Sequence, residues 1–236
     1  RKLRLYINQP GYLPWAGFFG MLSSSDVHVV LDSVQYIKNE WVNRNRVCYP
    51  NWQEWSYITV PVKYSFGQKI NEVEIANKPW AQTHLKTLRS CYSRYPYYDE
   101  VIEQLKPLYD QDYIKLFDLI FDIQNTLIRL LGISTKIIKL SDMDIFTKKS
   151  KLVADIASEL NADVLIMPEG SKVYFDQSCL SSGVEVLWHK FSSPRYESLH
   201  KFIPDLSILD VLFSVGTDDT RSLIDQAEEN SLFKVI

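Results

Sequence analysis

Residues 3–31 read LRLYINQPGYLPWAGFFGMLSSSDVHVVL, and this stretch decides the fold class. The apolar run at 3–7 predicts a strand, and the prolines and glycine at 10–14 predict a turn. Helical spacing of apolar residues at 15–22 predicts a helix, and the β-branched run at 27–31 predicts a second, buried strand. Together these elements form a βαβ unit, in which the strands are parallel and the crossover is right-handed.

The same alternation returns in the last third of the chain. Strands are predicted at 135–140, 163–167 and 184–188, and helices at 150–160, 173–180, 206–213 and 220–229, with Ser150 as an N-cap. Between the two α/β parts lie short strands at 55–60 and 72–76 and three helices at 79–92, 97–109 and 112–131, the last stopped by Gly132. Alternation at both ends predicts one α/β domain over residues 1–236. It has a three-layer, mostly parallel, Rossmann-like sheet, and residues 79–132 form a helical connection between its halves.

Composition limits the classes of protein to which the chain can belong. Hydrophobic residues make up 46% of the 236 residues and charged residues 23%, which is ordinary for a globular protein. The net charge of −3 gives no reason to expect a nucleic-acid partner. The N-terminal residues do not resemble a signal peptide and no apolar run is long enough for a membrane span, so we expect a cytoplasmic protein. Cys48, Cys91 and Cys179 have no metal-ligand spacing, and no metal site is predicted.

Three polar segments follow predicted parallel strands, at 8–15, 32–36 and 168–174. Ligands bind at the carboxyl ends of such strands, so we expect the three segments to meet at one edge of the sheet. The candidate side chains in these segments are Asn8, Gln9, Tyr12, Trp15, Asp32, Gln35, Glu169 and Lys172. The start of the helix near Pro14 is a candidate seat for an anion, and the alternative is that its prolines only shape a turn.

Residues 43–46, Asn-Arg-Asn-Arg, are the densest polar cluster. In an extended segment Arg44 and Arg46 share one face and Asn43 and Asn45 share the other. Two arginines on one face suit a diphosphate or a carboxylate, and the alternative is a surface loop paired with Glu40 or Glu54. On the first middle helix, His84 is a candidate general base and Lys86 a candidate substrate contact.

The strings NQPGYLPW at 8–15, LDSVQY at 31–36, WVNRNR at 41–46 and ITVPV at 58–62 resemble the WbqC-like protein family in order and spacing. Softer matches follow at 84–88, 92–98 and 202–210. Two departures stand out. Residues 170–172, Gly-Ser-Lys, replace a glycine-rich stretch with arginine, and Asp205 replaces the more usual asparagine.

This resemblance implies a role in bacterial surface polysaccharide (O-antigen) biosynthesis, with glycyl or acyl transfer onto an amino-sugar nucleotide. In that reaction His84 or Glu169 takes the amine proton, Arg44 and Arg46 hold the diphosphate, and ATP or an acyl thioester activates the acyl group. The opening βαβ unit also looks like the start of adenylyltransferases and of amide-forming ligases such as pantothenate synthetase, although it lacks the histidines that bind ATP there.

Two other functions are consistent with the sequence. A non-catalytic protein of the same pathway would bind a nucleotide sugar or a partner enzyme without needing His84 or Glu169. A glycosyltransferase would use a metal-binding Asp-x-Asp, a spacing that Asp142 and Asp144 provide. The acceptor sugar, the donor and the oligomeric state do not follow from the sequence.

Overall fold

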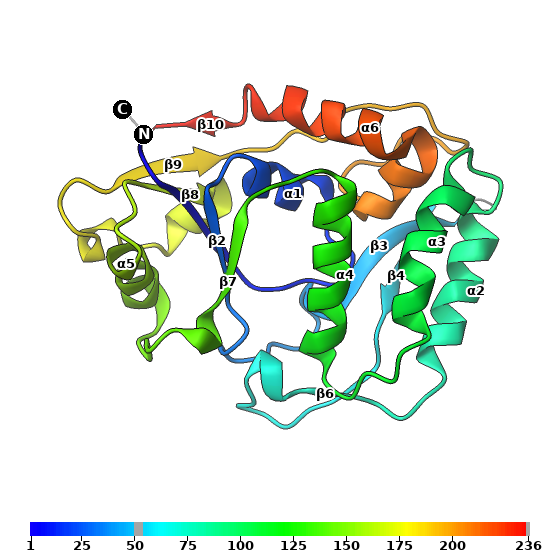
Figure 1. Cartoon of the computed structure of the whole chain (residues 1–236), viewed down its shortest axis with the longest axis horizontal. Coiled ribbons are helices and arrows are strands. Elements are labelled where there is room, and N and C mark those ends of the chain that lie inside the picture. The colour runs from blue at the N-terminus through cyan, green and yellow to red at the C-terminus, as the bar shows by residue number, and fades with distance from the viewer. Residues whose placement is uncertain (50–53, 235–236) are drawn as a thin grey trace.

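A six-stranded sheet organises the chain, as the computed structural model shows for residues 1–49 and 54–234 (Figure 1). Its strands are β1 (Arg4–Asn8), β2 (Val27–Val30), β7 (Lys136–Lys139), β8 (Val164–Pro168), β9 (Glu185–His189) and β10 (Leu232–Phe233). Their order is β10-β9-β8-β1-β2-β7, and β10 alone runs antiparallel to its neighbour. The predicted mostly parallel, Rossmann-like sheet is therefore confirmed.

The strand order places a switch of winding direction beside β1. In β1, Leu5 pairs with Val27 of β2 on one edge and with Leu165 of β8 on the other. The chain first builds the sheet outward through β2 and β7, and then returns to build it in the opposite direction through β8 and β9. Connections at the carboxyl ends of β1 and β8 diverge to opposite faces, and a crevice opens at such a point.

Both faces of the sheet are covered, because its strands are apolar on both sides. Tyr6 belongs to a large core with α1 (Ala16–Ser23), α4 (Leu116–Leu130) and α6 (Ile208–Glu228). Its neighbour Leu5 belongs to a smaller core with α5 (Lys149–Glu159). Figure 1 shows α5 on one side of the sheet and α1, α4 and α6 on the other. The alternation of strand side chains thus generates the three layers.

A long insertion separates β2 from β7. It contains an antiparallel ribbon of β3 (Arg44–Tyr49) and β4 (Glu54–Thr59), a second of β5 (Val62–Lys63) and β6 (Glu74–Ile75), and the helices α2 (Trp80–Tyr92), α3 (Tyr98–Tyr109) and α4. In Figure 1 these helices and ribbons lie beyond the sheet on the side of α4. The strands predicted near 55–60 and 72–76 are present, but they pair outside the main sheet.

Two local predictions were wrong, and a third was confirmed with different bounds. Ser150 does not cap α5, because the helix begins at Lys149, and the Ser150 hydroxyl instead accepts a hydrogen bond from the Asp176 amide at 2.9 Å. Residues 173–180 form the ends of short 3₁₀ turns and no α-helix. The two helices predicted at the end of the chain are both present within α6, which is kinked at the non-helical Gly216. Its φ of +83° and the nearby Tyr97 ring, 2.8 Å from where a Cβ would lie, both require glycine.

Candidate functional site

A cavity of about 680 Å³, here called cavity A, opens at the switch point beside the carboxyl end of β1. Its polar lining comes from Asn8, Gln9, Glu40, Asn45, Arg46 and Asp205. Its aromatic lining comes from Trp15, Phe18, Trp41 and Tyr174. These residues come from the end of β1, the start of α1, the β2–β3 connection, β3 and two later loops. Aromatic walls with a few convergent amide and charged groups are typical of a small-molecule site.

Arg46 brings the positive charge of cavity A. The alternation of β3 buries Asn45 and leaves Arg44 and Arg46 half-exposed on the other face, as predicted. The Arg46 guanidinium lies 5.3 Å from the Trp41 ring and 5.1 Å from the Trp55 ring, and its Nη2 donates to the Asp205 carbonyl at 2.9 Å. Its Nε is buried and has no partner among the described residues.

The alternative of arginines paired with acidic residues is not observed. Among residues 1–49 and 54–234, neither Arg44 nor Arg46 forms an ion pair with Glu40 or Glu54. Arg44 stacks at 4.0 Å on the Tyr57 ring, donates to the Asn39 carbonyl and does not line cavity A. Only one of the two arginines is thus positioned to hold a ligand in this cavity.

Trp15 closes one wall of cavity A and changes the start of α1. Its indole ring folds back onto Gly17, so closely that a Cβ at residue 17 would lie 2.3 Å from a ring carbon. The other face of this wall is Phe191, whose ring meets the indole edge-on at 5.5 Å. The ring packs beside the first helical turn and forms an aromatic wall there, and anion binding at the start of α1 stays a prediction.

A second hollow of about 1150 Å³, here called cavity B, lies at the carboxyl ends of β2 and β7. Its lining includes Gln35 from the β2 connection and the segment between β7 and α5. Gln9 lines both cavities, because it follows β1, which carries cavity A and is the neighbour of β2, where cavity B begins. Two of the three segments predicted to meet at this edge, 8–15 and 32–36, therefore do so, and the third reaches cavity A through Tyr174.

Two predicted residues lie in the interior. Tyr12 is 0% exposed and His84 is 5% exposed, and neither lines a cavity. The His84 Nε2 donates to the Thr59 carbonyl at 2.8 Å, so its Nδ1 accepts from the Tyr12 hydroxyl at 2.7 Å, and Tyr109 in turn donates to Tyr12. Burial lowers the pKa of His84 to about 4, against the hydrogen bond to Thr59. When the imidazole is neutral, every donor and acceptor in this series of hydrogen bonds has a partner. His84 therefore has no free nitrogen to take a substrate proton.

Asp32 and Asn43 are also committed to the fold. The Asp32 carboxylate is buried and accepts from the amide of Ser141 at 2.9 Å and from its hydroxyl at 2.5 Å. Asp32 therefore holds the connection that follows β7 against the connection that follows β2. Both connections line cavity B. The Asn43 side chain donates to the Val60 carbonyl at 2.9 Å and closes the end of the β3–β4 ribbon.

The remaining predicted residues stand outside both cavity linings. Glu169 lies 3.9 Å from the Lys172 ammonium and 4.0 Å from the Lys190 ammonium at the end of β8. Lys172 also lies over the rings of Trp188 and Phe233. Lys86 is exposed on the outer face of α2. The structure does not bring these side chains to Gln9 or Arg46.

Four lining residues escaped the sequence analysis as site candidates: Glu40, Trp41, Tyr174 and Asp205. Glu40 and Trp41 lie in the connection before β3, where no periodic pattern marks a side chain that faces a ligand. Tyr174 is 77% exposed, a rare state for a large aromatic residue, and the sequence alone does not show exposure. Asp205 has a φ of +61°, uncommon for a residue other than glycine, and this turn carries it to the cavity.

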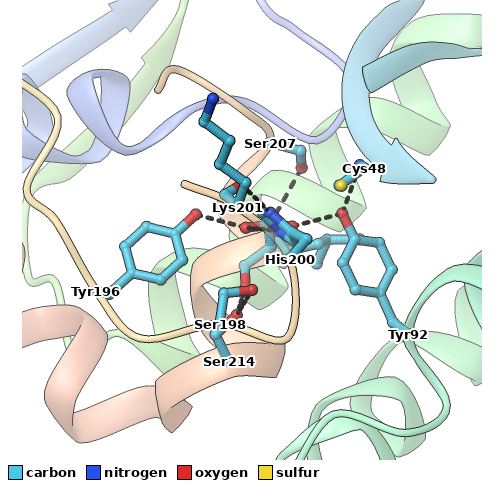
Figure 2. Close-up of polar contacts among 10 residues, drawn as sticks. Cys48, Tyr92, Tyr196, Ser198, His200, Lys201, Ser207 and Ser214 are labelled. Carbon is cyan, nitrogen blue, oxygen red and sulfur yellow. Dashed lines mark hydrogen bonds and ion pairs between the residues drawn. The ribbon is translucent and has the colours of Figure 1, made fainter. Parts of the chain in front are cut away.

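A separate polar cluster that includes Tyr92, Tyr196 and His200 lies in the interior (Figure 2). It surrounds the carboxylate of Asp210, which is 0% exposed. Its carboxylate accepts hydrogen bonds from Tyr92 at 2.8 Å, Tyr196 at 2.5 Å and the His200 Nε2 at 2.8 Å. Burial alone would lower the pKa of His200, but hydrogen bonds with Asp210 and Cys48 and the charge of Asp210 raise it to about 10. The result is a buried ion pair.

Cys48, His200 and Asp210 are the residue types of a nucleophilic triad, but their surroundings are closed. Cys48 and Asp210 are both 0% exposed, and none of the three lines cavity A or B. The cluster instead ties α2, β3, α6 and the segment before α6 together, since the Cys48 amide also donates to the Tyr92 hydroxyl at 2.9 Å. Its role is to hold β3, and with it Arg46, in place.

The buried histidines predict a two-sided dependence of stability on pH. His28 and His84 have pKa values lowered from 6.5 to about 4, mainly by burial, so the unfolded state binds more protons as pH falls through this window and stability is lost. His200, raised to about 10, acts oppositely, and its stabilisation is lost as pH rises from 6.5 to about 10. Urea unfolding from pH 4 to pH 10 should show a maximum between the two windows, with each histidine contributing at most about 1.4 kcal/mol per pH unit. A flat profile across both windows would contradict these assignments.

No helix among the described residues has both the length and the apolar character that crossing a bilayer requires. The same part of the chain contains no group of three or more histidine, cysteine or acidic residues placed to hold a metal ion.

The chain is similar in sequence to a curated protein and to the profile of a protein family. A curated protein of Mycobacterium tuberculosis (strain ATCC 25618 / H37Rv), named uncharacterized protein Rv1507c, is 30% identical over 219 residues, which are 91% of this chain and 95% of that relative. No solved structure matches. The profile of the WbqC-like protein family matches residues 9–222, from the shared cavity residue Gln9 into the last helix. The chain belongs to the WbqC-like protein family.

Proposed function

We propose that the chain binds an amino-sugar nucleotide in cavity A and transfers a glycyl or other acyl group onto its amine. The observation that carries the proposal is the composition of cavity A, where one arginine, three amide side chains, two carboxylates and four aromatic rings surround a space of about 680 Å³. Aromatic faces suit a nucleobase or the apolar face of a sugar, and a guanidinium suits a diphosphate. Few other ligand classes need all of these groups together.

Each group has a role in this proposal. Arg46 binds the diphosphate, because it lines cavity A and the rings of Trp41 and Trp55 hold its guanidinium in place. Trp41, 46% exposed, offers a ring face on which a base can stack. Gln9 reads the hydroxyl groups of the sugar, and Asn8 positions it, because the Asn8 side chain donates to the Tyr6 hydroxyl at 2.7 Å and accepts from the Gln9 amide at 2.8 Å. Glu40 and Asp205 are the carboxylates that attract the sugar ammonium group.

The transfer step balances as an ordinary aminolysis. The deprotonated amine attacks the carbonyl carbon of an activated acyl group, a C–N bond forms, and a C–O bond to AMP or a C–S bond to a carrier thiol breaks. ATP, consumed to form the acyl adenylate, or a thioester is the co-reactant. Glu40 takes the amine proton in place of His84 or Glu169, since Glu40 lines the cavity and they do not. The family resemblance supports a role for this reaction in surface-polysaccharide assembly, in the cytoplasm.

One observation favours the non-catalytic alternative. The cavity A lining contains no histidine, and its acidic residues belong to loops. A protein that only carries or presents a nucleotide sugar would need the same arginine, amide groups and aromatic walls and no acid–base group. The two functions therefore share a binding site and differ in whether product forms.

Mass spectrometry after incubation with amino-sugar nucleotides separates these functions. The full chain is mixed with the nucleotide and either glycine with ATP or acyl thioesters, and the nucleotide is examined for the mass of one added acyl residue. Product that disappears in the Glu40→Gln variant supports transfer. Binding without product in any mixture supports the carrier function. If no amino-sugar nucleotide binds at all, both fail.

A further inference from the structure

Cavity B carries charges of both signs that the protein leaves uncompensated. Its lining contains three lysines, Lys69, Lys148 and Lys149, and three carboxylates, Glu72, Asp142 and Asp144, which sum to zero net charge. None of the six takes part in an ion pair among residues 1–49 and 54–234. Side chains of opposite sign that share a hollow without pairing can compensate the two charges of one bound molecule.

The charges are also ordered along the chain. Asp142 and Asp144 follow β7, and Lys148 and Lys149 stand four to seven residues later, where α5 begins. Lys149 has a φ of +55°, which is uncommon for a lysine and occurs at the first residue of that helix. The positive end of the α5 dipole adds to the charge of the lysines at this end of the cavity. The two carboxylates of this segment thus attract a cation, and the two lysines at the start of α5 attract an anion.

We infer that cavity B binds a free α-amino acid as its zwitterion. The ammonium group of the amino acid lies at Asp142 and Asp144, and its carboxylate lies at Lys148 and Lys149. Apolar residues of the same lining, among them Met143 and Leu152, leave room for a side chain. A nucleoside triphosphate fits less well, because its several negative charges would face three carboxylates with no net positive charge to offset them.

The inferred site rests on the proposed function for its role. Gln9 belongs to both linings, so an amino acid in cavity B and an amino sugar in cavity A would approach each other at the end of β1. A transferase that joins an amine to an aminoacyl group needs such an arrangement of two adjoining hollows. The amino acid is thereby assigned as the source of the transferred group, and ATP remains the co-reactant that activates its carboxylate.

The test is binding, measured by ligand-observed NMR and calorimetry on the full chain, with the protein amino acids offered singly. At least one amino acid should bind. Its N-acetyl derivative, which lacks the ammonium charge, and its amide, which lacks the carboxylate, should each bind about tenfold more weakly or worse. Inorganic phosphate should bind more weakly than the amino acid.

Paired variants locate the binding. The double variant Asp142→Asn with Asp144→Asn should bind the N-acetyl derivative as well as it binds the amino acid. The double variant Lys148→Gln with Lys149→Gln should bind the amide as well as it binds the amino acid. All four residues are exposed, so the variants should fold. Asp219→Asn and Lys78→Gln change exposed residues outside both linings and should leave binding unchanged.

Three outcomes would overturn the inference: no amino acid binds, phosphate binds more tightly, or both derivatives bind as well as the parent amino acid. The outcome for cavity A is separate, because amino-sugar nucleotide binding should survive both double variants. If the amino acid binds and no amino-sugar nucleotide does, the proposed function fails and the amino-acid site stands.

Discussion

Replacing Asp210 by asparagine should lower the free energy of unfolding by about 3–5 kcal/mol, the largest single effect on stability that we expect. The variant removes the partner anion of the buried His200, whose imidazole must then either stay charged without compensation or lose its proton. The hydroxyl groups of Tyr92 and Tyr196 also compete for a single amide oxygen. Urea unfolding at pH 7 measures this change in the free energy of unfolding. Both proteins are fitted with the same m-value, the slope of that free energy against urea concentration.

Asp219→Asn on the same helix is the matched control, since this aspartate is exposed and should change stability by less than about 0.5 kcal/mol. An equal shift in both variants would show that the cluster around Asp210 does not stabilise the fold. Raising the pH through the window of His200 should narrow the gap between Asp210→Asn and the parent protein, because the ion pair is then already lost.

The largest effect on binding should come from Arg46→Lys, which we expect to weaken amino-sugar nucleotide binding by about tenfold to a hundredfold. Lysine keeps the charge but loses the planar fork that binds two phosphate oxygens together, and it cannot stack between Trp41 and Trp55 in the same way. Isothermal titration calorimetry with an amino-sugar nucleotide measures the change.

The matched control here is Arg89→Lys, an exposed arginine on α2 that lines neither cavity. Its affinity for the nucleotide should equal that of the parent protein. If Arg46→Lys binds as tightly as the control while both remain folded, the diphosphate does not lie at Arg46, and the assignment of cavity A to a nucleotide loses its main support.

Local patterns in the sequence were enough to predict the fold class. The opening βαβ unit follows from the apolar runs and from the turn at Pro10 and Gly11, which are local properties. The two faces of residues 43–46 follow from alternation alone. The prediction of Ser150 as an N-cap was wrong, because the preference of serine for N-cap positions does not show at which residue a helix starts. The Ser150 hydroxyl instead accepts a hydrogen bond from the Asp176 amide.

The candidate site was predicted in part, for a physical reason. Strand ends are visible in a sequence, so Gln9 and Gln35 were placed at the correct edge. Burial depends on residues far along the chain, and the sequence does not show that Thr59 and Tyr109 enclose Tyr12 and His84. Polar residues near a predicted edge therefore include both those that face a cavity and those that hold the loops beneath it.

The thiol of Cys91 is 2% exposed, and burial, together with the nearby Cys48 and Asp210, raises its pKa to about 12. Alkylating reagents attack the thiolate, so the native protein should react at Cys179, which is half-buried, long before Cys91. The rate at which Cys91 is labelled would then report the rate at which the interior around Asp210 opens, and no introduced probe is needed.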